Sequence, residues 1–268
     1  MSILEEILAT KRDEVTVLRR PETRALLRSQ ALDAPPVRDF SAALRRADGR
    51  LAVIAECKRR SPSKGELAPD LDPAATARAY AAGGAAAMSV LTDAEYFGGR
   101  IADLQAARDA VDIPILRKDF TIDEVQVYEA RAVGADAILL ILAALPDDAH
   151  LMDLHDLARS LDLGVLVEAH DRDEIARGVG LGVGILGVNA RDLATFGEDL
   201  EAAAASGAGI PAGTVAVAES AIRSVDDAAA MVAVGFDAVL VGEALVRSPD
   251  PTGLVSAMAG LTVRARGG

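Results

Sequence analysis

The sequence predicts an α/β fold, a (β/α)8 TIM barrel with an N-terminal helical extension. From residue 51 onward, short apolar runs of strand length recur eight times, and Ala-rich amphipathic segments lie between them. Strands that alternate with helices in this way form a parallel sheet with helical crossovers. Eight such units in the remainder of a 268-residue chain match the count and the size of a (β/α)8 barrel.

The first 50 residues differ from the rest of the chain and predict helices. Apolar residues near the N-terminus fall at helical spacing among charged ones, namely Ile3, Leu4, Ile7, Leu8 and Val15. Pro21 ends this amphipathic helix or begins the next turn. A second helix is expected over about 22–30 and a short third one over 41–46.

Each expected strand and helix of the barrel has a sequence signature. The strand-like runs are 51–58, 86–92, 113–118, 136–142, 164–169, 184–190, 214–219 and 237–242. The amphipathic segments between them are 72–82, 101–110, 123–133, 147–161, 171–179 and 224–234. Several of these segments open with Asp or Ser, as helix N-caps do, and four strands follow a glycine turn of the kind that ends a helix.

A doubly wound open sheet is the main alternative to the barrel. Such a sheet more often has five or six strands and carries a glycine-rich phosphate loop after its first strand. Neither G-x-G-x-x-G nor G-x-x-x-x-G-K-[ST] stands directly after the first strand, which ends near residue 58. The barrel is therefore favoured, as one domain over 1–268 in which residues 1–50 form the helical extension and 51–268 form the eight βα units.

The composition is that of a soluble globular protein, with 51% hydrophobic and 26% charged residues. A net charge of −13 argues against nucleic-acid binding, and no apolar run is long enough to span a membrane. The N-terminus carries acidic residues early and has no basic region typical of a signal peptide. Together with a single cysteine, these features predict a cytoplasmic protein that binds neither nucleic acid nor membrane, and we expect a monomer.

Candidate metal ligands are scarce. One cysteine and three histidines predict no zinc site, and we expect no cofactor. Cys57 alternates out of phase with its neighbours Glu56 and Lys58, so it is expected to face the helices as a small core residue. His170 follows Glu168 closely and is expected at the rim of the barrel.

Polar residues gather at the carboxyl ends of the expected strands, where barrels of this class carry their active sites. Glu56 and Lys58 end the first strand two residues apart, so they point to the same face. Other strands end in Lys118, Glu168, Asn189, Arg191 and Glu219. Burying charge is costly unless the charges pair or meet a ligand, so the pattern predicts a site capable of acid–base catalysis. The alternative is a mutual cluster of ion pairs that plugs the barrel.

The ends of the seventh and eighth strands carry Ser220 and Gly242, each close to the start of a helix. Backbone N–H groups at helix N-termini form the usual phosphate site of such barrels, so the substrate is expected to carry a phosphate. The alternative for Ser220 is a helix cap. An acidic protein can bind an anion where positive charge is concentrated, as it is at Lys58, Arg59, Arg60 and Lys64.

Taken in chain order, six sets of residues resemble the motifs of indole-3-glycerol phosphate synthases, enzymes of tryptophan biosynthesis. They are Ile54-Ala55-Glu56-x-Lys58-x-x-Ser61-Pro62-Ser63, Ser89-Val90-Leu91-Thr92 with Tyr96-Phe97-Gly98-Gly99, Leu116-x-Lys118-Asp119-Phe120, Val167-Glu168, Gly187-Val188-Asn189-x-Arg191-Asp192-Leu193 and Ala218-Glu219-Ser220. The resemblance covers nearly the whole chain. It implies the substrate 1-(2-carboxyphenylamino)-1-deoxyribulose 5-phosphate and the products indole-3-glycerol phosphate, carbon dioxide and water, without a cofactor.

The resemblance also implies catalytic roles. Lys118 would be the general acid that protonates the ribulose carbonyl as the aromatic carbon attacks it, and Glu168 would be the general base in the later dehydration. Lys58 would hold the anthranilate carboxylate and share in proton transfer, and Glu56 would position the two lysines. An aldolase barrel, with Lys118 as a Schiff-base nucleophile, is the rival enzymatic interpretation. A barrel kept only as a binding scaffold is disfavoured by the intact set of charges.

Substrate-binding roles are implied by the same resemblance. Asn189, Arg191 and Glu219 would hold the ribulose hydroxyls or the carboxylate. Leu91 and Phe97 would form the apolar wall for the aromatic ring, although Phe97 could instead be a loop anchor on the barrel rim.

The phosphate would be bound by Ser220 and the backbone near Gly242, with help from Ser61 or Ser63. The family usually reads Glu-Ser-Gly after the seventh strand, whereas this chain has alanine at Ala221. A methyl group at that position is expected to modify substrate affinity.

Overall fold

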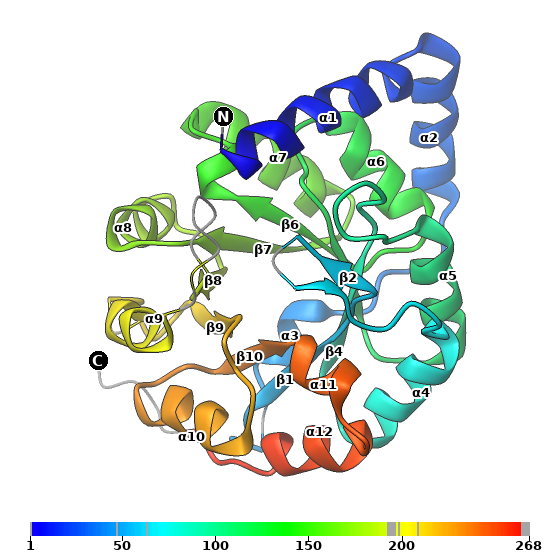
Figure 1. Cartoon of the computed structure of the whole chain (residues 1–268). Coiled ribbons are helices and arrows are strands. Elements are labelled where there is room, and N and C mark those ends of the chain that lie inside the picture. Colours follow the sequence, from blue (N-terminus) through cyan, green and yellow to red (C-terminus); the bar gives the residue numbers. More distant parts are fainter. Residues whose placement is uncertain are drawn as a thin grey trace.

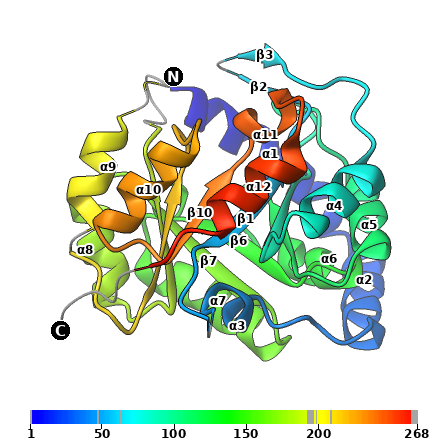
Figure 2. The same ribbon diagram turned by 90° about the horizontal axis from the view of Figure 1, so that it is seen from below.

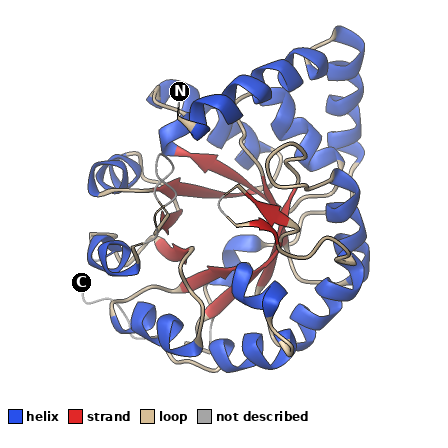
Figure 3. Cartoon of the chain, viewed as in Figure 1, coloured by secondary structure: helices blue, strands red, loops and turns tan. Residues whose placement is uncertain are grey.

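The computed structural model describes residues 2–46, 48–62, 64–191, 197, 199–207 and 209–263. Eight parallel strands close into a barrel in the order β1-β10-β9-β8-β7-β6-β5-β4, and helices surround it (Figure 1). The strands form the centre and the helices the outer ring, as the colouring in Figure 3 shows. The expected (β/α)8 barrel is therefore confirmed, with helices ahead of its first strand.

Every barrel strand lies inside the run of residues expected for it. The strands are β1 (Ala52–Cys57), β4 (Ala87–Leu91), β5 (Ile115–Lys118), β6 (Ala137–Ile141), β7 (Gly164–Ala169), β8 (Ile185–Asn189), β9 (Val215–Glu219) and β10 (Ala238–Val241). Nearly all of their residues are buried, as expected for parallel strands covered by helices on one face and packed against one another inside the barrel.

The expected helices also form, and most begin one residue after an acidic or serine N-cap. They are α1 (Ile3–Leu18), α2 (Pro21–Asp33), α3 (Phe40–Leu44), α4 (Pro73–Ala82), α5 (Ile101–Ala110), α6 (Glu124–Ala132), α7 (Asp148–Ser160), α8 (Arg172–Gly180) and α10 (Val225–Ala233). Side chains of Asp72, Asp123 and Asp171 accept hydrogen bonds from the first backbone N–H groups of their helices. Such caps satisfy donors that would otherwise have no partner, which fixes where each helix starts.

Several short elements were not among those expected. They are the hairpin of β2 (Arg60–Ser61) and β3 (Gly65–Glu66), the 3-10 helix η1 (Leu142–Ala144), α9 (Leu200–Gly207), α11 (Glu243–Arg247) and α12 (Pro251–Ala259). The hairpin lies at the end of the barrel opposite to α3, which Figure 2 shows from the side. Phe40 of α3 is buried beside Gly164, at the amino-terminal end of the strands.

The helical extension reaches the opposite, carboxyl end of the barrel through a buried lysine. Lys11 of α1 is 1% exposed. Its amine lies 2.9 Å from a carboxylate oxygen of Asp93 and 2.9 Å from one of Asp119, which follow β4 and β5. The helix α2 packs along α6 on the outside (Figure 1). In the described part of the chain, no helix is long and apolar enough to cross a membrane.

Candidate active site

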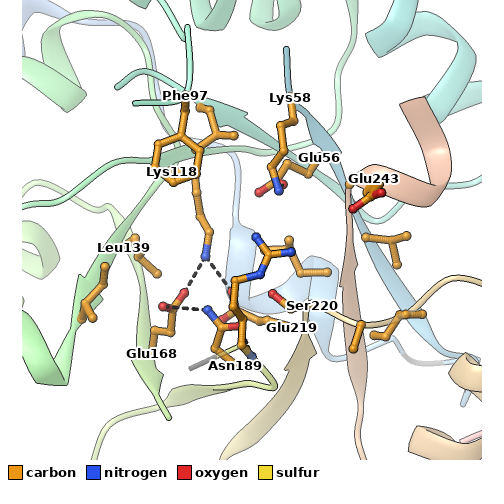
Figure 4. Close-up of a pocket in the computed structure, with 18 of the residues that line it drawn as sticks. Glu56, Lys58, Phe97, Lys118, Leu139, Glu168, Asn189, Glu219, Ser220 and Glu243 are labelled. Carbon is orange, nitrogen blue, oxygen red and sulfur yellow. Dashed lines mark hydrogen bonds and ion pairs between the residues drawn. The ribbon is translucent and has the colours of Figure 1, made fainter. Parts of the chain in front are cut away.

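A pocket of roughly 920 Å³, counting the solvent at its mouth, opens at the carboxyl ends of the strands. Most residues predicted for the site line it, namely Glu56, Lys58, Leu91, Phe97, Lys118, Glu168, Asn189, Arg191, Glu219, Ser220 and Gly242 (Figure 4). These residues come from seven different strand ends or the loops after them. The barrel topology thus brings residues that are far apart in sequence together in one cluster.

Lys118 is the centre of this cluster. Its Nζ donates hydrogen bonds to Oε2 of Glu168 and Oε2 of Glu219, each at 2.6 Å (Figure 4). Burial alone would lower the pKa of this amine, but the neighbouring carboxyl groups of Glu168, Glu219 and Glu56 outweigh burial and hold it above its usual range. Lys118 is therefore a charged proton donor rather than a free amine near neutral pH.

Glu168 is surrounded by donors. Its Oε1 accepts a hydrogen bond from Asn189 Nδ2 at 3.1 Å and lies 3.2 Å from His170 Nε2, while Lys118 occupies Oε2. Burial works to raise the pKa of this carboxyl, but Lys118 and His170 outweigh burial and lower it. Glu168 is thus held as a carboxylate that can accept a proton.

Glu219 has the opposite protonation tendency. Burial and the nearby charge of Glu168 raise the pKa of Glu219 to about 8, against the opposing effect of Lys118. Its carboxyl fits because Gly187 has no side chain, since a Cβ there would overlap Oε1 of Glu219. The two carboxyls that share Lys118 therefore differ, one being ionised and the other protonated near neutral pH.

Glu56 and Lys58 form an ion pair at the end of β1, as their spacing on one face predicts. Glu56 is 1% exposed, and its carboxylate approaches the backbone at Gly242, where a Cβ would clash with it. Ser89 donates a long hydrogen bond of 3.5 Å to its other oxygen. Cys57, between the two, packs in the core shared with the helices, which confirms its expected orientation.

One wall of the pocket is apolar. The rings of Phe97 and Phe120 have centroids 6.2 Å apart, and Leu91 and Leu139 extend the same wall. Phe97 is held by its loop, because Oδ1 of Asp93 accepts a hydrogen bond from its backbone N–H at 3.1 Å. Sequence reasoning missed Phe120 and Leu139; for Phe120 a signal existed, since it lies two residues after Lys118.

The opposite edge of the pocket is formed by the segments after β9 and β10. Ser220 and Ala221 both have positive φ, 64° and 57°. The position of Ala221 is therefore in the left-handed region that glycine prefers, which gives a conformational reason for glycine there. Glu243 also lines this edge, and its carboxylate lies 3.2 Å from Nε of Arg247. Arg223 lines the same edge and was missed by sequence reasoning.

The predictions for Ser61 and Ser63 differ in outcome from those for the other predicted site residues. Ser61 is buried in β2 and is not among the described residues that line the pocket. Its Oγ accepts a hydrogen bond of 3.2 Å from the backbone N–H of Lys64. Ser63 lies outside the described residues, as do Asp192 and Leu193 of the sequence motif.

His170 was expected at the rim, yet it contacts Glu168 directly. Its side chain is 11% exposed, and its two ring nitrogens lie near two different carboxylates. The proximity of His170 to Glu168 in the chain was visible, but its contact with Glu168 depends on how the loop turns. Among the described residues, no group of three or more His, Cys, Asp or Glu side chains is arranged to hold a metal ion.

The fold and the pocket are those of a (β/α)8 barrel whose lysine and glutamate side chains are in contact at the carboxyl ends of the strands, where enzymes of this class have their active sites. The family model of indole-3-glycerol phosphate synthase matches residues 4–258. An indole-3-glycerol phosphate synthase of Nocardioides sp. is 51% identical over 261 residues, which cover 97% of this chain and 99% of the relative. One of Laribacter hongkongensis is 50% identical over 252 residues, covering 93% and 95%. The chain belongs to the indole-3-glycerol phosphate synthase family.

The barrel architecture is also found in a solved structure of low sequence identity. Thiamine phosphate pyrophosphorylase from Pyrococcus furiosus matches with a TM-score of 0.57 and 19% identity, over 80% of this chain and 96% of that one. At this identity the likeness concerns the fold alone.

Proposed function

We propose that this protein is an indole-3-glycerol phosphate synthase. It would convert 1-(2-carboxyphenylamino)-1-deoxyribulose 5-phosphate into indole-3-glycerol phosphate, carbon dioxide and water, in the biosynthesis of tryptophan. The observation that carries the proposal is the amine of Lys118, hydrogen-bonded to both Glu168 and Glu219 inside a pocket with one apolar wall. Membership of the family supports the same reaction.

The pocket offers a distinct surface to each part of this substrate. The aromatic ring would pack on Leu91 and Phe97, where burial of apolar area favours binding. Its carboxylate would pair with Lys58, which is partly exposed to the pocket and already close to Glu56. The ribulose hydroxyls would meet Asn189 and Arg191, which line the same pocket as Glu168.

The phosphate would bind at the edge formed after β9 and β10. Ser220 and the backbone near Gly242 lie there. Help from Ser61 or Ser63 stays a prediction, since Ser61 is not among the described residues that line the pocket and Ser63 lies outside the described residues. Glu243 is a carboxylate at this edge, and its ion pair with Arg247 offsets the repulsion that it would exert on a phosphate.

Lys118 is suited to protonate the ribulose carbonyl oxygen during ring closure. The aromatic carbon attacks the carbonyl carbon, and the developing oxyanion takes the proton of the ammonium. Loss of carbon dioxide then restores the aromatic ring, so the electrons of the broken bond return to the ring and no cofactor is required. In the later dehydration, Lys58 would give a proton to the hydroxyl group formed in ring closure, which leaves as water, and the ionised Glu168 would take a proton from the neighbouring ring CH2 group, so that the new double bond forms between the two ring carbons.

Glu219 would act beside these two residues. As a protonated carboxyl it can donate a hydrogen bond to a substrate hydroxyl while it accepts one from Lys118. Glu56 would hold Lys58 by their ion pair and would help to stabilise the charged form of Lys118. We further propose a cytoplasmic monomer that binds no nucleic acid, in keeping with the net charge of −13.

The experiment that tests the proposal is fluorescence detection of indole-3-glycerol phosphate formed from the synthetic substrate. Wild type is expected to make product, and Lys118→Ala is expected to lose about 10²–10⁴-fold in rate, the usual contribution of a positioned acid. A wild-type protein that makes no product would overturn the proposal. The aldolase alternative is tested by borohydride trapping, and no lysine is expected to be labelled because a protonated amine is a poor nucleophile.

A further inference from the structure

His170 occupies a defined position between β7 and α8, immediately before the Asp171 that caps the helix. Its Nε2 lies 3.2 Å from Oε1 of Glu168, and its Nδ1 lies 3.2 Å from Oε2 of Glu174. Its backbone N–H also donates to that oxygen of Glu174, at 2.8 Å. The imidazole therefore links the pocket carboxylate to the first turn of α8.

A carboxylate oxygen near each ring nitrogen favours the doubly protonated ring. A neutral imidazole has one N–H and one lone pair, so one ring nitrogen would face a carboxylate oxygen without a proton between them. Burial lowers the pKa of His170, but the two glutamates overcome burial and raise it to about 10. Near neutral pH the ring is an imidazolium that forms an ion pair with each carboxylate.

Glu174 is itself held in place. It is the third residue of α8, and its backbone N–H donates to Oδ1 of Asp171 at 2.8 Å. A carboxylate in the first turn is also favoured by the partial positive charge of the helix N-terminus. The order of contacts thus runs from the helix to Glu174, then to His170, and then to Oε1 of Glu168.

We propose that His170, held by Glu174, is a positioning residue for Glu168: it fixes the orientation of that carboxylate and keeps it ionised for proton transfer. The inference rests on the proposed function, because it assigns Glu168 the role of base. It goes beyond that function by extending the catalytic arrangement from the strand ends to the first turn of α8.

The charged and polar groups that face this arrangement come from several elements. Glu168 is contacted by Lys118 of β5, by Asn189 of β8 and by His170, and its charge also acts on Glu219 of β9. The hollow beside His170 is lined by Asp171, Arg172, Asn189 and Asp199 among the described residues. Loss of the imidazolium would leave Glu168 with one cation fewer in contact, so the pKa of Glu168 would rise.

The kinetic test compares wild type with His170→Gln from pH 3.5 to pH 9, because the lowered pKa of Glu168 puts the acidic limb of wild type below about pH 4.5. The acidic limb of kcat/KM reports the base of the free enzyme, so it is expected to move to higher pH by about one unit in the variant. At neutral pH, kcat is expected to fall roughly tenfold while KM changes little, because the residue acts through Glu168 rather than on bound substrate. Glu174→Gln, which keeps the ring but removes its anchor, is expected to give a smaller shift in the same direction.

The matched control is His155→Gln. His155 lies on α7 with Asp156 as its partner and is not among the described residues that line the pocket. This variant is expected to keep the wild-type pH profile. A folded His170→Gln protein with wild-type kcat and an unmoved acidic limb would overturn the inference.

A second measurement needs no substrate, so its failure is distinguishable from failure of the proposed function. Histidine ring carbons labelled with 13C are followed by NMR during a pH titration of wild type, with His170 assigned by elimination from the spectra of His150→Gln and His155→Gln. One of the three histidines is expected to remain an imidazolium above pH 8, and Glu174→Gln is expected to lower its titration midpoint. If His170 titrates near pH 6.5 like an exposed histidine, the inference is wrong, even where His170→Gln fails to fold.

Discussion

Glu168 and Glu219 share one amine, since Lys118 Nζ lies 2.6 Å from an oxygen of each carboxyl group. One ammonium contacts two carboxyls in a buried site, and the two respond differently. Donors from Asn189 and His170 favour the ionised form of Glu168, whereas burial and the nearby carboxylate favour the protonated form of Glu219. The pocket therefore contains a proton donor, a proton acceptor and a neutral carboxyl within one group of contacts.

This difference predicts unequal effects of removing the two charges. Glu168→Gln removes the proposed base and is expected to lower kcat by about 10²–10⁴-fold. Glu219→Gln resembles the protonated carboxyl already present and is expected to lower kcat only about tenfold. Steady-state kinetics at pH 7 measure kcat of both variants. Equal losses of kcat would contradict the assignment of Glu168 as ionised and Glu219 as protonated.

The raised pKa of Glu219 also predicts that the stability of the fold depends on pH. A carboxyl whose folded-state pKa of about 8 exceeds its unfolded value of 4.5 stabilises the fold fully below pH 4.5. This contribution is lost as pH rises from 4.5 to 8, because only the unfolded chain releases the proton readily. Glu219→Gln is expected to remove this loss, so the free energy of unfolding from urea titrations should fall less between pH 5 and pH 8 than in wild type. If the free energy of unfolding changes equally with pH in wild type and in Glu219→Gln, the raised pKa of Glu219 is wrong.

Gly187 predicts a steric test of the position of Glu219. A Cβ at residue 187 would overlap Oε1 of Glu219, so Gly187→Ala is expected to displace that carboxyl from Lys118 and to lower activity at least tenfold. Gly184, just before the same strand, has open space where its Cβ would lie, and Gly184→Ala is the matched control with activity near wild type. Equal activity of the two variants would show that the contact between Glu219 and Lys118 does not affect activity.

Ala221 predicts a stabilising substitution. Its φ of 57° is strained for alanine, so Ala221→Gly is expected to raise the free energy of unfolding by about 1 kcal/mol. The control is Ala102→Gly on the exposed side of α5, where glycine is expected to cost about 1 kcal/mol. Urea denaturation of both variants provides the comparison, and the same sign of change in both would refute the conformational argument.

Lys11 predicts that the helical extension contributes strongly to stability. Lys11→Met would leave the buried carboxylates of Asp93 and Asp119 without this cation, and the expected loss is about 3–5 kcal/mol. Lys64 is exposed in the β2–β3 turn, and Lys64→Met is expected to change stability by less than about 0.5 kcal/mol. Thermal and urea unfolding measure the difference, which should be absent if the buried ion pairs are energetically neutral.

Much of the barrel could be predicted from the sequence because its strands are short apolar runs separated by capped helices. The hairpin at Arg60–Ser61 and Gly65–Glu66 could not, because four paired residues are too few to show a period. The helices α9, α11 and α12 were also missed; α11 has only five residues and no side-chain cap.

The residues of the site likewise include some that could be predicted from the sequence and some that could not. Lys118 and Glu168 could be found because each ends a strand of a barrel whose active face is known from topology. Arg117, the charged neighbour of Lys118, faces the other way and pairs with Asp119 and Glu129 behind the strand. The role of His170 could not be inferred, because it depends on a loop turn that brings the ring between two glutamates.

In the proposed mechanism, Lys118 supplies the proton for ring closure in a pocket that binds the substrate independently of that proton. The most direct measurement is the single-turnover rate of indole-3-glycerol phosphate formation by Lys118→Ala, alongside the Kd of the same variant for substrate. We expect a rate about 10²–10⁴-fold below wild type with a Kd changed by less than about tenfold. A single-turnover rate within twofold of wild type would show that Lys118 does not supply this proton.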